Sequence, residues 1–274
     1  MKIQRARTYI AVGVASALAL LVACATVAVT GRKQLSLIPT STMMSMGAQE
    51  YGQFLEKNPP SQDAAGTALV VKVGTKIQKS VERYFSKQKM SSHLQGYEWE
   101  FNLVDSKDAN AWCMPGGKVV VYSGLLPVTK DETGLAVVLG HEISHAIAEH
   151  GSERMSQGLL AQLGGMALSE AVKSKPEQTR SLWMSAFGVG AQYGALLPFS
   201  RLQESEADRL GLIFMAMAGY DPRGALDFWQ RMEAAKGGKA PPEFLSTHPS
   251  DETRIRNIRE YMKEAKRYYR SSTS

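Results

Sequence analysis

The chain has 274 residues, of which 44% are hydrophobic, and a formal net charge of +6. This length and apolar content suffice for one domain with a full core. Three of the basic residues (Lys2, Arg5 and Arg7) lie at the N-terminus, and without them the net charge is +3 (29 basic minus 26 acidic residues). So mild a charge argues against a nucleic-acid-binding protein, and we expect no nucleic-acid partner.

Residues 1–23 have the layout of a lipoprotein signal peptide. The basic start is followed by an uncharged apolar run from Tyr9 to Ala23, which is shorter than the ~20 residues of a membrane-spanning helix. A plain membrane anchor is therefore the weaker interpretation. The tripeptide LVA before Cys24 is similar to a bacterial lipobox, which implies cleavage before Cys24 and lipid on its sulfur. Ala25 as the next residue implies sorting to the outer membrane.

Cysteine usage limits what can stabilise the exported domain. The chain has two cysteines, so Cys113 is the only thiol left if Cys24 carries lipid. No internal disulfide is then possible, and the fold must depend on its core and on a bound metal. We expect Cys113 to be a small buried apolar side chain and not a nucleophile.

The N-terminal half predicts a tether followed by helices. Residues 24–45 are polar and rich in Ser and Thr, which predicts a lipidated tether that packs in part on the domain. A helical pattern covers 46–57 and ends at the sequence NPP. From Ala64 to Lys87 apolar residues recur every four positions, which predicts a longer helix.

The hydrophobic period then changes from four to two. Alternation over Tyr97 to Leu103 predicts a half-buried strand, and Lys118 to Ser123 predicts a second one. The sequence PGG before the second strand supplies a tight turn, so Ala109 to Met114 is expected to pair with it as a hairpin. These segments predict a small antiparallel β-sheet in a mostly helical α+β fold.

The stretch HEISH at residues 141–145 carries the strongest chemical signal. His141 and His145 are one helical turn apart and share a face, where two neutral imidazoles can bind a single zinc ion. Glu142 beside them has the chemistry of a catalytic base. This is the helical HExxH pattern of zinc metalloproteases. A surface helix that happens to hold two histidines is the alternative.

The surroundings of this helix give further expectations. Thr129 to Glu132 form a capping box ahead of it, and Gly151 is predicted to end it. On one continuous helix, His150 should point away from the metal and lie at the surface. Residues 158–199 are rich in Gly, Ala, Leu and Met but contain no clean span of ~20 apolar residues. They favour two core or membrane-facing helices, with an exposed apolar patch, over a transmembrane hairpin.

A zinc enzyme needs a third protein ligand. The metzincin pattern would place a histidine six residues after His145, where this chain has Gly151, so that class is excluded. The sequence ESEAD at 204–208 offers a glutamate instead. Glu204 and Asp208 share a helix face, so Glu204 can bind the metal while Asp208 holds a ligand histidine by its other nitrogen. Glu206 should face elsewhere, and an ordinary acidic helix start is the alternative for this segment.

HEISH and ESEAD together resemble the zinc peptidases related to the heat-shock protease HtpX, the CAAX prenyl protease and the mitochondrial Oma protease (metallopeptidase family 48). The likeness is greatest to their LoiP-like members, which are soluble, single-domain lipoproteins of the bacterial envelope. It covers the chain from about residue 34 to the last helix. Asn110-Ala111 with the sequence PGGKVVVYSGLL resembles the active-site edge strand of the family. The sequence STHP at 246–249 with Arg254 resembles its C-terminal signature.

The resemblance implies a zincin domain of the gluzincin type over residues 46–274, with one zinc ion per chain. Its zinc ligands would be His141, His145 and Glu204. Glu142 would be the catalytic base, and Asp208 would support a ligand from behind.

The resemblance also implies that Asn110 and Ala111 bind substrate. His248 would lie near the metal, where it would stabilise an oxyanion or, at rest, cap the zinc. The implied function is an endopeptidase that faces the periplasm at the outer membrane and cleaves misfolded or unfolded envelope proteins. A zinc-stabilised envelope chaperone or assembly factor with latent peptidase activity is the alternative.

Overall fold

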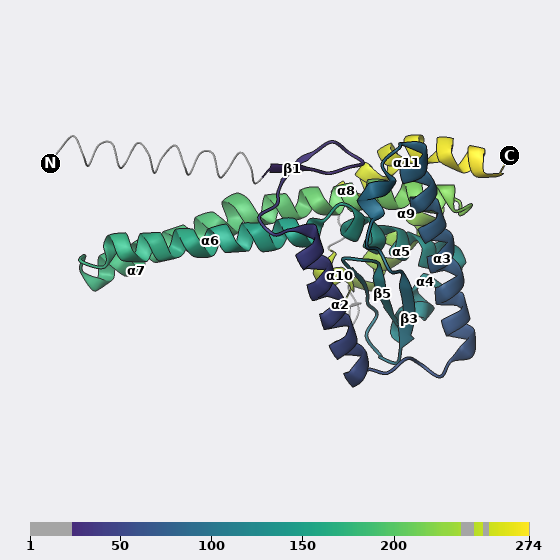
Figure 1. Cartoon of the computed structure of the whole chain (residues 1–274), viewed down its shortest axis with the longest axis horizontal. Helices are drawn as coiled ribbons and strands as arrows, with labels where there is room; N and C mark the ends of the chain where they lie inside the picture. Colours follow the sequence, from purple (N-terminus) through teal and green to yellow (C-terminus); the bar gives the residue numbers. More distant parts are fainter. Residues whose placement is uncertain (1–23, 237–243, 249–251, 274) are drawn as a thin grey trace.

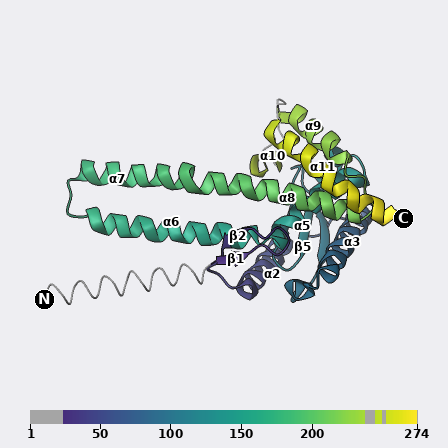
Figure 2. The same ribbon diagram turned by 90° about the horizontal axis from the view of Figure 1, so that it is seen from above.

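The structure is a computed structural model that describes residues 24–236, 244–248 and 252–273 (Figure 1). The predicted signal peptide, residues 1–23, lies outside these ranges. The described chain forms a mostly helical core from which a long helical hairpin extends to one side (Figures 1 and 2). Within the described ranges, every helix is too short or too polar to span a bilayer.

The segment predicted as a tether is folded over most of its length. Strands β1 (Cys24–Thr26) and β2 (Lys33–Leu35) pair antiparallel, with Cys24 opposite Leu35. Helix α2 (Thr40–Lys57) follows and begins six residues before the predicted start at 46. The partial packing expected for 24–45 therefore extends to a hairpin and the first turns of a helix.

Helix α3 (Ala64–Lys87) has the predicted bounds. It begins where it does because the Asp63 carboxylate accepts hydrogen bonds from the N–H groups of Ala65 and Gly66. Its four-residue apolar spacing buries one face against the core, through Val70, Val73, Ile77, Val81 and Phe85. A short 3₁₀ turn, η1 (Ser91–Leu94), leads on to the sheet.

The three-stranded sheet has the order β3-β5-β4. Strand β4 (Ala111–Met114) pairs antiparallel with β5 (Lys118–Tyr122), as the predicted hairpin requires. Strand β3 (Glu100–Val104) runs parallel to β5 on its other side. The mostly helical α+β class is confirmed, but the expectation of antiparallel pairing throughout is wrong, because the chain reverses twice between β3 and β5. Strand β4 is left at the edge, where it packs against α5.

Helix α5 (Glu132–Ile147) carries HEISH and lies in the centre of the core. It follows the short elements η2 (Ser123–Leu125) and α4 (Leu126–Thr129), and its first turn is capped by Asp131, whose Oδ1 accepts a hydrogen bond from Gly134. Every residue from Gly134 to Ile147 is buried. The predicted end at Gly151 is wrong, because the helix stops at Ile147 and the chain turns at Glu149, which has a left-handed φ of 55°.

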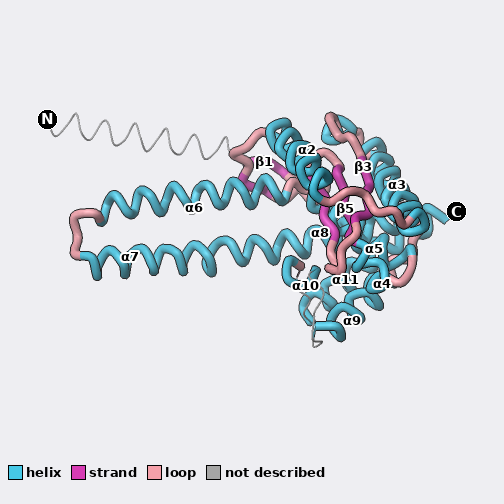
Figure 3. The backbone as a smooth tube through the Cα atoms, turned by 90° about the horizontal axis from the view of Figure 1, so that it is seen from below, coloured by secondary structure: helices cyan, strands magenta, loops and turns pink. Residues whose placement is uncertain are grey.

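The hairpin is built from α6 (His150–Val172) and α7 (Glu177–Val189). A π-helical segment, η3 (Gly190–Leu196), joins α7 to α8 (Leu197–Met217), which returns to the core. The two arms lie side by side in the view from above and in the view from below (Figures 2 and 3). The expected apolar patch is present on the hairpin, whose exposed side chains include Leu159, Leu163, Met166, Leu182, Trp183 and Val189.

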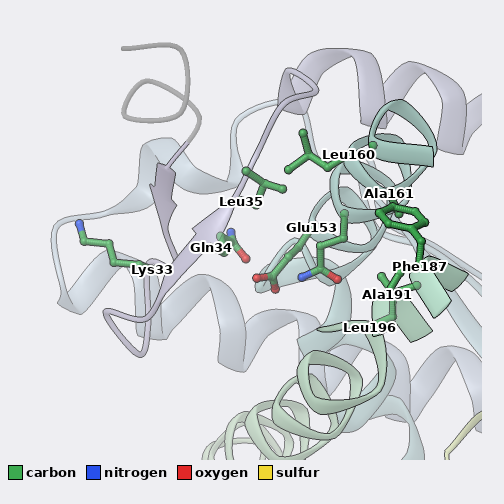
Figure 4. A pocket seen from close by; sticks show the side chains of 11 residues that line it. Lys33, Gln34, Leu35, Glu153, Leu160, Ala161, Phe187, Ala191 and Leu196 are labelled. Carbon is green, nitrogen blue, oxygen red and sulfur yellow. The ribbon is translucent and has the colours of Figure 1, made fainter. Parts of the chain in front are cut away.

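A largely apolar cavity of about 530 Å³ lies at the base of the hairpin (Figure 4). Leu35 of β2 and Leu160 of α6 face each other across one side of it. Ala161, Phe187, Ala191 and Leu196 also line it. The cavity is therefore separate from the HEISH residues of α5.

Helices α5 and α8 approach each other closely because glycines meet at their crossing. A Cβ atom on Gly211 would lie 2.9 Å from the carbonyl carbon of Gly140 and from the backbone nitrogen of His141. Helix α11 (Glu252–Thr273) packs on α8, and α9 (Gly224–Lys236) packs on α5. The short helix α10 (Phe244–Thr247) lies between α9 and α11 in the sequence and directly precedes His248. The two helices that carry HEISH and ESEAD are thus held at backbone contact.

Replacing Gly211 with alanine is expected to lower the free energy of unfolding by about 1–3 kcal/mol, because the backbone of α5 must move to admit a methyl group. Chemical denaturation gives this value directly. Gly158→Ala is the matched control, since nothing lies within 4 Å of a Cβ atom at that helical position. It should raise the free energy of unfolding by roughly 0.5–1 kcal/mol. Equal effects of the two substitutions would contradict the close contact.

Candidate metal centre

Four side chains with metal-binding atoms converge between α5, α8 and the end of α10. Single ligand atoms of His141, His145, Glu204 and His248 all lie within 4.8 Å of one another. The Nε2 atoms of the first two are 3.1 Å apart, and each is 3.3 Å from a carboxylate oxygen of Glu204. The three predicted ligands are therefore brought together. Imidazole nitrogens with one carboxylate are a donor set that suits zinc.

The charge balance of this cluster favours a cation. Burial alone would lower the pKa of His141, but its contacts with Asp208 and Glu204 outweigh burial and raise the pKa to about 9. Burial alone would raise the pKa of Glu204, yet hydrogen bonds from His141, His145 and His248 hold it well below its usual range. Glu204 is thus a carboxylate surrounded by donors, in a place where a positive charge is stabilised.

Glu142 lies beside the ligands but is not one of them. Its side chain is 6% exposed, and burial raises the pKa of its carboxyl. Among the described residues its Oε1 atom has no hydrogen-bond partner, and His248 Nε2 is 3.3 Å away. A buried carboxylate with an unsatisfied oxygen and a raised pKa is suited to accept a proton at this position.

Asp208 lies behind His141, as its spacing from Glu204 predicts. Its Oδ1 atom is 2.9 Å from His141 Nδ1, which leaves Nε2 for the metal. Arg254 donates two hydrogen bonds of 2.8 Å to Asp208. The guanidinium of Arg254 also stacks 3.5 Å from the ring centroid of Trp229. Arg254, which the sequence marks only as part of a C-terminal signature, is thus a buried support for the aspartate.

His150 contradicts the sequence-based expectation that it points away to the surface. The side chain is fully buried, and its Nδ1 atom lies 2.7 Å from Nδ1 of His145. The turn at Glu149 starts α6 in a new direction and brings His150 back behind the ligand. No sequence signal marks this left-handed turn, because glutamate is not a residue that favours positive φ.

Glu206 faces away from the metal, as expected, but it enters a buried ion cluster that the sequence does not indicate. Its Oε2 atom is 3.0 Å from His150 Nε2 and 2.7 Å from Arg32 Nε. Arg32 also binds Glu153 through two contacts of 2.8 Å. Burial alone would raise the pKa of Glu206, but His150, Thr30 and Arg32 outweigh burial and lower it to about 2.

This depressed pKa predicts a loss of stability in acid. Glu206 stabilises the fold above its ordinary pKa of 4.5, and that contribution is lost as pH falls from 4.5 towards 2. Glu206→Gln should therefore lower the free energy of unfolding by about 2 kcal/mol at pH 7, and by progressively less below pH 4.5. Denaturation with chelator present at each pH measures this without metal release.

The control for that prediction is Glu264→Gln, which removes the more exposed ion pair with Arg209. It should change the free energy of unfolding by less than about 1 kcal/mol. A difference between wild type and Glu206→Gln that does not shrink in acid would contradict the role of the Glu206 charge.

His248 lies within the cluster, in contact with two of the other three residues. Its Nδ1 atom is 3.1 Å from His141 Nε2 and 2.9 Å from Glu204 Oε2. The residue follows α10, where its N–H donates to the carbonyl of Phe244. Phe244 in turn donates to the carbonyl of Ala109, which ties this loop to the chain just before β4.

Asn110 and Ala111 lie at the start of the edge strand and not within the cluster. The side-chain oxygen of Asn110 accepts a hydrogen bond from the N–H of Ala111, and the backbone carbonyl of Asn110 accepts one from the N–H of Tyr122. On the same strand, Cys113 is half-buried and not fully buried as expected, and desolvation raises the pKa of its thiol, so that it remains neutral. A neutral thiol supports a structural role for Cys113 and not that of a nucleophile. Strand β4 thus lies next to α5, the helix that carries His141 and His145.

A family model described as Peptidase family M48 matches residues 73–262. The match includes both helices that supply the cluster, together with His248. The chain belongs to peptidase family M48. The family named by the motifs is thereby confirmed, and the mostly helical α+β fold described above is that of an M48 domain.

Several relatives within and beyond the bacteria share this M48 domain. The chain is 40% identical to mitochondrial metalloendopeptidase OMA1 of Schizosaccharomyces pombe over 64% of this chain and 50% of that protein. It is 31% identical to OMA1 of Homo sapiens over 83% of this chain and 44% of that protein. It is 34% identical to the beta-barrel assembly-enhancing protease of Yersinia pestis over 59% of this chain and 34% of that protein. The chain thus spans half or less of the length of these relatives.

Proposed function

We propose that this M48 chain is a zinc-dependent endopeptidase of the bacterial cell envelope that cleaves unfolded or misfolded proteins. The observation that carries the proposal is the buried convergence of His141, His145 and Glu204 beside Glu142. Two imidazoles, one carboxylate and an adjacent basic carboxylate make up the set that a zinc peptidase needs. The metalloendopeptidase names of the relatives support the same reaction.

The chemistry follows from the positions of the side chains. Zinc held by the three ligands would polarise a peptide carbonyl and lower the pKa of a water molecule. Glu142 takes the proton of the attacking water and returns it to the leaving amine. Asp208 holds the ring of His141 by its Nδ1 atom, so that Nε2 stays directed at the cluster. His248 either donates a hydrogen bond to the oxyanion or leaves the cluster before substrate enters.

The edge strand β4 supports an extended substrate that is recognised through its backbone, independently of its amino-acid sequence. Strand β4 is at the end of the sheet and packs against α5, which carries Glu142. A peptide can add to such an edge through backbone hydrogen bonds, beginning at Asn110 and Ala111. Only a chain that exposes its backbone can pair in this way. Unfolded or misfolded proteins are therefore the class of substrate.

Lipid on Cys24 would hold the domain at the membrane, facing the periplasm. Cys24 opens β1, so the attachment point is the first residue of the folded hairpin. We place the domain at the outer membrane because Ala25 follows Cys24, and one relative, from Yersinia pestis, is named for beta-barrel assembly. The lipobox-like sequence before Cys24 supports the same location.

A zinc-stabilised chaperone or assembly factor with latent peptidase activity is the second candidate. The specific observation in its favour is His248 Nδ1 within the ligand set, where it completes a group of four donors. A closed set of four protein ligands is typical of structural zinc sites, whereas catalytic sites keep one position open. The two candidates therefore differ in whether His248 leaves the cluster.

The test is cleavage of an unfolded protein by the purified, zinc-loaded chain. Unfolded casein should be cut, a tightly folded protein should remain intact, and a chelator should stop cleavage until zinc is added back. Binding of one zinc ion per chain without cleavage would favour the chaperone. Cleavage that persists in chelator would contradict a metallopeptidase.

A further inference from the structure

The N-terminal hairpin is joined by charge to the helices of the metal centre. Arg32, between β1 and β2, contacts Glu153 of α6 and Glu206 of α8 at 2.7–2.8 Å. Thr30 donates a hydrogen bond to the other oxygen of Glu206. The side chain of Glu153 is 1% exposed and that of Glu206 is 5% exposed, so the guanidinium forms ion pairs with two buried carboxylates. The N-terminal hairpin, formed by β1 and β2, lies at the base of α6 (Figure 2).

From Glu206 the contacts continue through His150 to the ligand His145. Nε2 of His145 faces Glu204, so this is the nitrogen that would bind the metal, and its Nδ1 atom must carry the proton. Nδ1 of His145 then donates to Nδ1 of His150, 2.7 Å away. His150 Nε2 carries the remaining proton and donates to Glu206 Oε2 at 3.0 Å. Every nitrogen in this chain of hydrogen bonds has one role.

The burial of His150 agrees with this assignment of protons. The ring is fully buried and each of its nitrogens has one partner, His145 at Nδ1 and Glu206 at Nε2. A ring that accepts through one nitrogen and donates through the other is a neutral imidazole. Reversing the direction would place a proton on Nε2 of His145 and remove its lone pair from the metal. Thus only one orientation of the hydrogen bonds is compatible with zinc at His145.

The two ligand histidines are therefore supported in parallel ways. His141 is held by Asp208, which is held by Arg254. His145 is held by His150, which is held by Glu206 and Arg32. Glu206 and Asp208 both belong to α8 but lead to different arginines, one from each end of the described chain.

We propose that Arg32, Glu206 and His150 are positioning residues, which fix the tautomer and ring orientation of His145 for the metal. The inference rests on the proposed zinc site and adds that the N-terminal hairpin is part of its support. Groups that hold a metal-ligating histidine from behind typically change metal affinity 10–100-fold when removed. A hairpin that only stabilises the fold would leave the metal affinity of the folded protein unchanged.

The experiment measures the zinc dissociation constant of the full chain by competition with a chromophoric chelator. His150→Leu removes the acceptor for His145 and should weaken zinc binding 10–100-fold. Arg32→Ala should weaken it about tenfold, since it acts through two intervening side chains. Cobalt-loaded protein should show an altered visible absorption spectrum in both variants, because the geometry of His145 changes. His150→Gln, which can accept from His145 and donate to Glu206, should recover most of the affinity.

Arg209→Ala is the matched control, because it also removes an arginine that is paired with a glutamate, and Arg209 lies one turn from Glu206 on α8. It should leave both zinc affinity and the cobalt spectrum unchanged. Circular dichroism and thermal unfolding of the zinc-free proteins identify any variant that fails to fold. If His150→Leu fails to fold, Glu206→Gln takes its place in every comparison.

A double-mutant cycle separates positioning from general stabilisation. If Arg32 acts through His150, Arg32→Ala should add little further loss of affinity in the His150→Leu background. An equal loss in both backgrounds, or no loss in the wild-type background while the wild type binds zinc, would overturn the inference. If the wild type itself binds no zinc, the proposed zinc enzyme fails instead, so the two failures are distinct.

Discussion

A Glu142→Gln chain is expected to bind zinc as tightly as wild type and to cleave unfolded casein about a thousandfold more slowly. The amide is nearly the same size as the carboxylate, but it cannot accept the proton of the attacking water. General bases accelerate such reactions roughly 10²–10⁴-fold. We expect a loss in the middle of this range because Glu142 is a buried carboxylate with a raised pKa. The measurement is the initial rate of casein cleavage at equal zinc content.

Glu170→Gln is the control for this substitution, because Glu170 lies exposed on the hairpin in a surface pair with Lys173. It should cleave at the wild-type rate. A Glu142→Gln chain that cuts as fast as wild type would show that the base is another group. A variant that loses its zinc would point to a structural role for Glu142 instead.

Removing the His248 imidazole should increase cleavage. Its Nδ1 atom lies against Glu204 and His141, and its Nε2 atom is 3.3 Å from Glu142, so the ring covers both the metal position and the base. Activity then scales with the fraction of molecules in which the ring has left. If that fraction is about one tenth, His248→Ala should raise the rate about tenfold.

The same measurement distinguishes the two roles of His248. If its ring stabilises the oxyanion, His248→Ala should lower the rate by about 10²–10³, as the loss of one such donor does. His248→Ser, whose hydroxyl ends one bond short of the Nδ1 position, should behave like the alanine variant under either role. Zinc content and the free energy of unfolding, measured for each variant, show that the protein remains folded and loaded.

Local patterns predicted what is determined locally. The bounds of α3 follow from its four-residue spacing and the cap at Asp63, and the convergence of His141, His145 and Glu204 follows from two motifs on two helices. Strand direction did not follow, because each strand has the same alternation whichever way its partner runs. Strand β4 lies between β3 and β5 in the sequence, but in the sheet it lies on the far side of β5. The chain therefore reverses twice between β3 and β5, which makes these two strands parallel.

The support behind the ligands could not be predicted, because it depends on backbone direction and on distant pairs. His150 faces inward only because Glu149 takes a left-handed conformation, which no residue type in that stretch demands. Arg32 meets Glu153 and Glu206 across 121 and 174 positions of sequence. Two adjacent basic residues in a polar segment, Arg32 and Lys33, give no sign of such partners.

The close crossing of α5 and α8 has a consequence for how the protein tolerates insertions. His145 and Glu204 are 59 positions apart in sequence (204 − 145), yet the glycines at 140 and 211 keep their helices in contact whatever lies between them. The intervening hairpin leaves from one fixed point and returns to another. Whole helical turns can therefore be gained or lost in equal numbers on its two arms without moving either ligand. The catalytic core and the hairpin are separate modules, and natural variation in length should collect in the second.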